Sequence, residues 1–321
     1  SVMTAHVALP QITGDEIPAT INPKVSTDIL RKDLKFDGII STDAMEMGAI
    51  VKGYSEEKSV VMAVQAGADV VLLPLDSKKA IDAIEAAVRR NEITEERINE
   101  SVRRLLRAKH RLGITENALV DLNQVNRVVE SPENVREANL IAEKSITLLR
   151  NASEMLPLSI EKANRTLFVV VAADDEPIEG AALMPEVQRR APNAKIVRFD
   201  PRTTPAEYEA ALTEAKNFDA VVLAVFVKRA AGKGTVALGE TQTNFVRQMT
   251  ALNGKPVAVI AFGSPYLIRQ FPEAKVYAVT YAIEEIAQTA AARTLFGEVP
   301  FQGKLPVRIP GLFEIGAGLV K

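Results

Sequence analysis

The chain has 321 residues, of which 47% are hydrophobic and 25% are charged, which is typical of a globular protein long enough for two domains. Lysine and arginine number 39 against 41 for aspartate and glutamate, so no broad basic surface indicates a nucleic-acid partner. There is no cysteine, which excludes disulfides and thiolate metal sites and leaves the compartment open. The longest apolar runs, such as 167–173 and 220–227, have the length of strands and are too short to span a bilayer.

Residues 1–113 form a pattern of repeated strand–helix units. Strands are predicted at 2–7, 38–42 and 69–74, and the continuous apolar character of the last strand is typical of a parallel sheet covered on both faces. The predicted helix starts are Asn22 followed by Pro23, then Ser55, Ser77 and Thr94. On the last of these helices we expect Ile98, Val102, Leu105 and Leu106 to face inward.

The periodicity lapses over 114–131, a polar stretch that we interpret as an interdomain linker. Strands and helices alternate again over 132–321, which predicts an open, mainly parallel sheet with helices on both sides. The predicted strands are 166–172, 195–199, 220–227, 257–262 and 276–281, with 305–309 as a further edge strand. The predicted helices are 132–146, 185–190, one capped by Thr204, 241–252 and 283–296.

Asp43 is the candidate for chemistry in the first domain because it ends the strand 38–42 and precedes a helical pattern. Reactive groups of parallel α/β barrels lie at the carboxyl ends of the strands, where a side chain faces a pocket. The structural alternative is that Asp43 caps the following helix. Either role would place the carboxylate near a helix dipole, which favours its charged form.

Two histidines occur, and their contexts differ. His110 precedes Gly113 at the end of a predicted helix, where a basic residue complements the helix dipole. His6 lies at the end of the first predicted strand, close to the expected pocket. Because its position at the helix end explains it, we assign His110 a structural role, whereas His6 stays a candidate for the pocket.

The runs Ser1-Val-Met-Thr-Ala-His-Val7 and Phe36-Asp-Gly-Ile-Ile-Ser-Thr-Asp43, with Met47 after them, resemble glycoside hydrolase family 3. The match is to its bacterial β-N-acetylglucosaminidase (β-hexosaminidase) branch, since Ala44 stands where the β-glucosidase branch usually has tryptophan. Gly263-Ser-Pro-Tyr266, 296–298 and 303–307 resemble the family's second domain. The resemblance implies the C-terminal portion of a (β/α)8 TIM-type barrel at 1–113, a linker at 114–131 and an open α/β/α sandwich domain at 132–321.

The activity implied by this resemblance is that of a retaining, exo-acting β-N-acetylglucosaminidase on cell-wall or chitin-derived oligosaccharides. Asp43 would be the nucleophile, and His6 and Met45 would line the sugar pocket. A core or supporting role for His6 stays open, and Met45 with Met47 is expected to pack beneath or beside the pocket. No cofactor and no metal is expected. The resemblance favours an extracytoplasmic or cell-wall-associated location.

The expected general acid is missing. The resembling branch carries its acid/base His and a partnering Asp in a Lys-His-Phe-Pro-Gly-His-Gly motif, upstream of the matched segment, and this sequence holds no such motif. A closed barrel takes about 250 residues, far more than 1–113 supply. We therefore expect a partner chain or segment to complete the barrel, and expect that the natural N-terminus lies before Ser1.

Two other functions stay open: a noncatalytic sugar-binding or assembly subunit, and a family 3 glycosidase acting on a β-glucoside or β-xyloside. The chain has no Trp and 5 Tyr, so few aromatic platforms exist for a long glycan, which favours a small terminal sugar. The Gly-rich loop 229–239 lacks P-loop spacing, and Gly263-Ser-Pro-Tyr266 lacks the nucleophile elbow, so we interpret them as a connecting loop and a capped turn.

Overall fold

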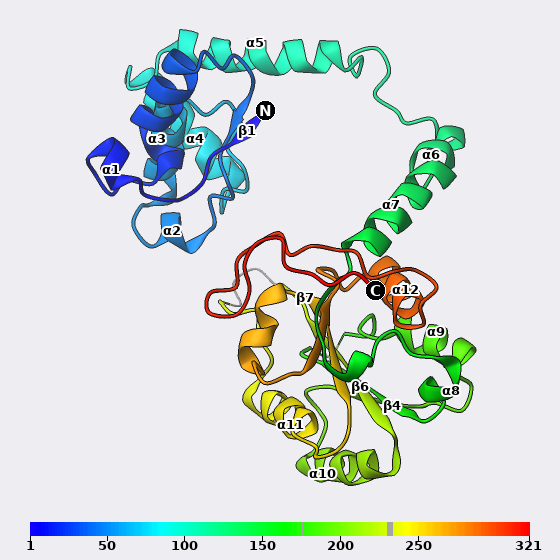
Figure 1. Cartoon of the computed structure of the whole chain (residues 1–321). Helices are drawn as coiled ribbons and strands as arrows, with labels where there is room; N and C mark the ends of the chain where they lie inside the picture. Colours follow the sequence, from blue (N-terminus) through cyan, green and yellow to red (C-terminus); the bar gives the residue numbers. More distant parts are fainter. Residues whose placement is uncertain (175, 230–233) are drawn as a thin grey trace. The chain divides into compact units, whose positions relative to one another are not determined.

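The computed structural model describes residues 1–174, 176–229 and 234–321, and the chain divides into two compact units, Ser1–Val125 and Asn126–Lys321 (Figure 1). The division lies within the stretch predicted as a linker. That stretch is not wholly irregular, because helix α6 (Leu122–Val128) forms inside it.

Unit 1 contains a small parallel sheet. Strand β1 (Val2–Met3) pairs with β2 (Ile40–Ser41), and Ser41 forms a parallel bridge to Val70. The three predicted strands therefore lie side by side and parallel, but each is shorter than predicted. A strand is fixed by partners on both sides, and among the described residues of this sheet the two outer segments have a neighbour on one side only.

The helices of unit 1 begin where local capping chemistry allows. Ser55 accepts from the Lys58 N–H and Thr94 from the Arg97 N–H, as predicted. The predicted cap Ser77 is wrong: it is the first helical residue, and Asp76 accepts from two backbone N–H groups. The elements are α1 (Pro10–Thr13), η1 (Ala19–Ile21), the π-helix η2 (Lys24–Asp33), α2 (Gly48–Val51), α3 (Glu56–Ala66), α4 (Ser77–Arg89) and α5 (Glu95–Arg111).

Two of the side chains predicted to face inward on α5 are exposed. Val102 has 44% and Leu106 53% of its surface accessible. Their periodicity fits a covered helix face, and no described residue of unit 1 covers these positions well enough to bury them. Leu34, at the end of η2, is likewise 68% exposed.

The buried anchor of unit 1 is Asp69, which the sequence did not single out. Its side chain is fully buried, and it accepts from Arg31 Nη2 at 2.5 Å, Ser101 Oγ at 2.6 Å and Arg104 Nη1 at 3.1 Å. It also accepts from the Ile40 N–H at 2.9 Å. Burial lowers the pKa of the Arg31 guanidinium, and the charge of Asp69 opposes that shift. One carboxylate thus joins η2, β2 and α5.

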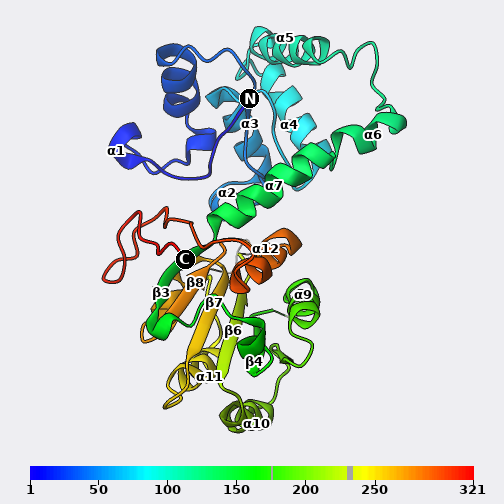
Figure 2. The same ribbon diagram turned by 45° about the vertical axis from the view of Figure 1, so that its right-hand side comes forward.

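Unit 2 is a six-stranded sheet of order β3-β8-β7-β6-β4-β5 (Figure 2). Its strands are β3 (Thr147–Asn151), β4 (Thr166–Ala172), β5 (Lys195–Phe199), β6 (Ala220–Val227), β7 (Val257–Gly263) and β8 (Val276–Val279). All neighbours are parallel except β3, which runs antiparallel to β8. Alternate residues of β4 enter two different cores, Phe168 on one face and Leu167 on the other. That double burial explains the continuous apolar runs.

Helices cover both faces of this sheet, as predicted. Side chains of α9 and α12 pack in the core that contains Phe168, and side chains of α10 and α11 pack in the core that contains Leu167. Thr204 and Glu207 form a reciprocal capping box at α10. The helices are α7 (Pro132–Ser145), η3 (Ala152–Glu154), α8 (Ile160–Ala163), α9 (Leu183–Arg190), α10 (Pro205–Glu214), η4 (Ala215–Asn217), α11 (Glu240–Thr250), η5 (Pro265–Gln270) and α12 (Glu285–Leu295).

The edge strand predicted at 305–309 is wrong, and the true edge strand β3 was not predicted. Leu305 and Ile309 donate to Ala317 and Phe313 instead, so the C-terminal segment folds on itself. Pro306 and Pro310 have no backbone N–H, which weakens any ladder there. Part of the Gly-rich loop 229–239 lies outside the described residues, whereas Ser264 caps η5 as predicted.

Candidate active site

Asp43 lies at the carboxyl end of the small parallel sheet of unit 1. The backbone pairing of the sheet ends just before it, where the Thr42 N–H donates to Val70 O at 3.0 Å. Thr42 is fully buried, and its Oγ1 accepts from the Leu72 N–H at 2.8 Å. The strand end that presents Asp43 is therefore fixed to its neighbour by both backbone and side chain.

Among the described residues, only one of the two carboxylate oxygens of Asp43 has a hydrogen-bond partner. Oδ1 accepts from the Ala44 N–H at 2.8 Å, and among the described residues no hydrogen bond or ion pair reaches Oδ2. The side chain is half-buried. Oδ2 is therefore available to a ligand, as the predicted nucleophile role requires.

The expectation that Asp43 lies at a helix start is wrong. Helix α2 begins only at Gly48, with Met47 at the N-cap position and no side-chain cap. Residues after Asp43 form a turn held by pairing with the neighbouring segment, where Met45 N–H donates to Leu72 O at 2.9 Å and Glu46 N–H to Leu73 O at 3.2 Å. The loop geometry, rather than a helix, places this carboxylate.

His6 lies next to this loop and is engaged at both ring nitrogens. Nε2 is 2.9 Å from Ala44 O, and Nδ1 is 2.9 Å from Thr20 Oγ1. These contacts engage both ring nitrogens, and the substrate-binding role of His6 stays a prediction. The Thr4 and Thr20 hydroxyls that complete the arrangement were not singled out from the sequence, although Thr4 lies in the same Met-Thr-Ala-His run.

Met45 is buried, with 3% of its surface exposed, and packs with Ile21, Ile50 and Ala63. It also lines a cavity of about 190 Å³ together with Tyr54 and Leu75. The placement agrees with packing beneath the loop, and a direct contact between Met45 and a sugar stays a prediction.

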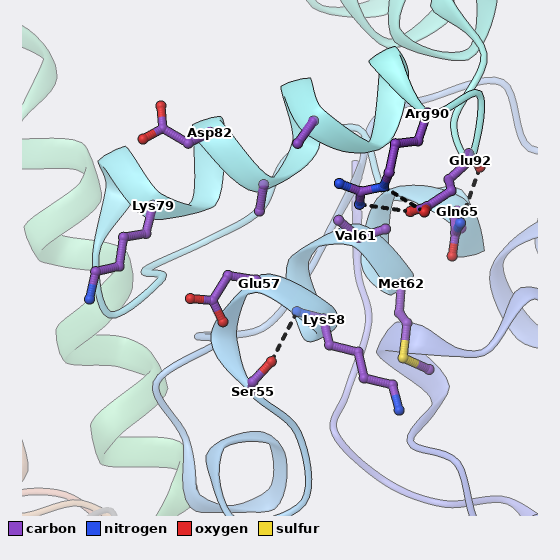
Figure 3. Close-up of a pocket in the computed structure, with 12 residues that line it drawn as sticks. Ser55, Glu57, Lys58, Val61, Met62, Gln65, Lys79, Asp82, Arg90 and Glu92 are labelled. Carbon is purple, nitrogen blue, oxygen red and sulfur yellow. Dashed lines mark hydrogen bonds and ion pairs between the residues drawn. The ribbon is translucent and has the colours of Figure 1, made fainter.

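A larger hollow of about 800 Å³ lies between α3 and α4. Val61 and Met62 lie along it, Lys79 and Asp82 carry charges at one end, and the Arg90–Glu92 pair lies at the other (Figure 3). None of the predicted site residues lines this groove, so we do not assign catalysis to it.

Unit 2 has its own hollow of about 560 Å³ at the carboxyl ends of β6, β7 and β8. Ser264, Tyr266, Tyr281 and Glu284 line it, and Tyr281 has a positive φ of 65°, a conformation that costs energy for a bulky residue. Carboxyl ends of parallel strands are where α/β sheets bind ligands, so this hollow is a second candidate site.

Metal and membrane features were sought in the described part of the chain. No group of three or more His, Asp or Glu side chains is arranged to hold a metal ion there. None of the helices described combines the length and hydropathy that a membrane crossing requires.

Comparisons with known proteins agree with this architecture. Residues 1–108 match the Glycosyl hydrolase family 3 N terminal domain, and residues 146–314 match the Glycosyl hydrolase family 3 C-terminal domain. The fold and these two matches define the chain as one that carries both domains of a glycoside hydrolase family. It belongs to glycoside hydrolase family 3.

Individual relatives differ in the activity that their names give. A "Beta-N-acetylglucosaminidase/beta-glucosidase" of Cellulomonas fimi is 22% identical over 96% of this chain and 57% of its own length. A "Putative beta-xylosidase" of Formosa agariphila is 25% identical over 90% of this chain and 41% of its own length. The solved family 3 β-N-acetylglucosaminidase of Paenibacillus sp. str. FPU-7 is 28% identical, with a TM-score of 0.77 over 94% of this chain and 57% of that chain. The chain thus spans about half the length of these relatives.

Proposed function

We propose that the chain contributes the nucleophile to a retaining, exo-acting β-N-acetylglucosaminidase that removes terminal N-acetylglucosamine from cell-wall or chitin-derived oligosaccharides. The observation that carries the proposal is Asp43, held at the end of the parallel sheet with Oδ1 on the Ala44 N–H and Oδ2 without a partner among the described residues. Oδ2 is the atom we assign to the attack.

The reaction would proceed in two displacements. Asp43 Oδ2 attacks the anomeric carbon while the glycosidic C–O bond breaks, and a separate acid gives its proton to the departing oxygen. Water then attacks the same carbon, gives a proton to that second group, and releases the Asp43 carboxylate. The two groups of such a pair lie roughly 5 Å apart.

The second group is proposed to come from outside this chain. Within unit 1 the loop from Asp15 to Asn22 carries two acidic side chains, Asp15 and Glu16. Asp15 Oδ1 already accepts from the Ile17 N–H and Asn22 Nδ2, and Glu16 is exposed. Both His6 nitrogens are engaged as well. The unpaired outer segments of the three-stranded sheet support a partner chain or segment that completes the barrel and brings the acid.

The choice of sugar rests on residues beside the nucleophile. Ala44 and Met47 follow Asp43 in the pattern of the β-N-acetylglucosaminidase branch, and two of the relatives carry that activity in their names. A β-glucoside or β-xyloside is the second candidate, because other names among the relatives include β-glucosidase and β-xylosidase. Noncatalytic sugar binding is the third candidate and predicts binding without turnover.

The test begins with the native source protein. Its molecular species are separated by size exclusion and identified by intact mass, and each is assayed with the p-nitrophenyl β-glycosides of N-acetylglucosamine, glucose and xylose. We expect the species that contains a completed barrel to cleave the N-acetylglucosaminide fastest. We refer to that species as the active species. Faster cleavage of the glucoside or xyloside would reject the proposed sugar, and binding without cleavage in every species would reject catalysis.

A further inference from the structure

We infer that His6 is a positioning residue for the nucleophile loop, whose neutral ring holds the Ala44–Met45 peptide through Nε2–H. The inference rests on the proposed function for its catalytic meaning, while the hydrogen-bond arrangement can be measured independently. It differs from the sugar-contacting role that the sequence suggested for this histidine.

The hydrogen-bond partners fix which ring nitrogen carries the proton. Ala44 O is a carbonyl and can only accept, so the 2.9 Å contact with His6 Nε2 requires a proton on Nε2. The neutral ring then has a lone pair on Nδ1, which accepts from the Thr20 hydroxyl at 2.9 Å. Thr20 Oγ1 in turn accepts from the Thr4 hydroxyl at 3.1 Å. The Thr4 hydroxyl also lies 3.3 Å from Ser41 O. With the Thr4 proton on the shorter contact, donation runs from Thr4 to Thr20 to His6 to Ala44.

This relay lies in a protected place. Thr20 is fully buried and Thr4 has 8% of its surface exposed, so water has little access to the two hydroxyls. A buried hydroxyl without a partner costs about 1 to 3 kcal/mol, which favours keeping all of these bonds at once. The ring is thereby held in one orientation by its partners on both sides.

The peptide that His6 holds is also held at its other end. The Ala44 carbonyl and the Met45 N–H belong to one peptide group, and the Met45 N–H donates to Leu72 O at 2.9 Å. Segments on both sides of β2 therefore hydrogen-bond to the same peptide group, His6 from the β1 side and Leu72 from the side of Val70. A planar peptide group that is hydrogen-bonded through both its carbonyl and its N–H has little freedom to rotate.

The fixed peptide sets the direction of the nucleophile. Ala44 precedes that peptide, and its N–H donates to Asp43 Oδ1 at 2.8 Å. Holding the Ala44 carbonyl limits the rotation of Ala44 and so aims its N–H at Oδ1, which leaves Oδ2 directed away. A misplacement of about 1 Å at a reacting group can cost roughly a hundredfold in rate, so loss of the His6 bond is expected to act on kcat.

Kinetics on the active species tests the catalytic part. The substrate is 2,4-dinitrophenyl N-acetyl-β-glucosaminide, whose leaving group departs without protonation, so formation of the glycosyl-enzyme does not depend on the acid. We expect His6→Leu to lower kcat roughly tenfold to a hundredfold with little change in KM. His6→Gln keeps an N–H donor that can reach the Ala44 carbonyl and is expected to recover part of that loss. The control is His110→Leu, the exposed histidine at the end of α5.

Nuclear magnetic resonance of the 321-residue chain tests the hydrogen bonds without any activity. The chain has 2 histidines, so selective ¹⁵N-histidine labelling gives two ring patterns, and His110→Gln assigns them. We expect His6 to show the neutral Nε2–H tautomer. Thr20→Val removes the donor to Nδ1 and should shift the Nδ1 resonance, while Thr20→Ser keeps a hydroxyl and should restore it. Circular dichroism confirms that each variant is folded.

The outcomes separate the inference from the proposed function. An Nδ1–H tautomer, or a Thr20→Val spectrum unchanged from wild type, would overturn the positioning inference. A His6→Leu variant whose KM rises at constant kcat would overturn it in favour of direct sugar binding. Absence of turnover in every wild-type species would reject the proposed function, and the ring spectrum would still decide how His6 holds the loop.

Discussion

Asp69 and Asp43 lie at opposite ends of the same parallel strand, β2. Asp69 Oδ2 accepts from the Ile40 N–H at the start of the strand at 2.9 Å, and Asp43 follows the strand at its carboxyl end. The side chain of Asp69 is fully buried and bonded to Arg31 and Arg104, whereas Asp43 is half-buried, and among the described residues its Oδ2 has no partner. In barrels of this kind the amino-terminal end serves stability and the carboxyl end serves chemistry.

Asp69→Asn is therefore expected to destabilise unit 1 by about 3 to 5 kcal/mol, because it leaves buried arginines without their counter-charge. Urea unfolding of the chain measures the change. The matched control is Asp37→Asn, since Asp37 is 81% exposed and its contact with Arg104 is 3.7 Å long; such a surface pair contributes about 0 to 1 kcal/mol. Equal effects of the two variants would contradict the assigned role of Asp69.

Asp43→Asn should abolish glycosidase turnover by the active species while changing the free energy of unfolding little. The amide oxygen can still accept from the Ala44 N–H, whose bond contributes about 0.5 to 1.5 kcal/mol, but a neutral amide is a poor nucleophile. Asp43→Ala should lose activity equally and lose that bond as well. Unchanged turnover of the p-nitrophenyl N-acetyl-β-glucosaminide by either variant would remove Asp43 from catalysis.

The stability of unit 2 should depend on pH through Glu179. Its carboxyl is fully buried, and neither oxygen has a hydrogen-bond partner among the described residues. Burial, followed by the charge of Asp174, raises the pKa of Glu179 from 4.5 to about 7. The folded state holds this proton more tightly than the unfolded state does, so the free energy of unfolding should fall as pH rises from about 4.5 to about 7.

Glu179→Gln stays neutral at every pH and should flatten that part of the stability profile. Thermal unfolding of the chain at closely spaced pH values from 4 to 8 measures the slope. Glu209→Gln, an exposed position on α10, is the control and should keep the wild-type slope. A slope that survives in Glu179→Gln would assign the pH dependence to other groups.

The 321-residue chain alone should show little or no turnover, with activity returning when a segment that completes the barrel is supplied in cis or in trans. Removing a general acid typically costs a factor of about 100 to 10,000, and both His6 nitrogens are engaged. Unpaired strand edges and exposed apolar side chains, among them Met3 at 61% and Leu73 at 55% exposure, should also drive self-association. A monomeric 34.8 kDa chain with full turnover would contradict the need for a partner segment.

The sequence by itself determined the features that depend on neighbouring residues. The apolar runs of β4 and β6 identify strands buried on both faces, and Thr204 identifies the start of α10, because a helix cap is formed within a few residues. The position of Asp43 at a strand end follows from the same local pattern. The family resemblance then indicated the class of reaction.

Only the tertiary structure decided the features that join distant segments. Strand β3 takes the sheet edge because Leu148 pairs with Ala278, a contact that no local propensity encodes. Asp69 acts as an anchor because Arg31, Ser101 and Arg104 converge on it from other elements. The bond from His6 to Ala44 links residues that are 38 positions apart. Such contacts form only when folding brings the segments together, since their free energy comes from shared burial rather than from adjacency in the chain.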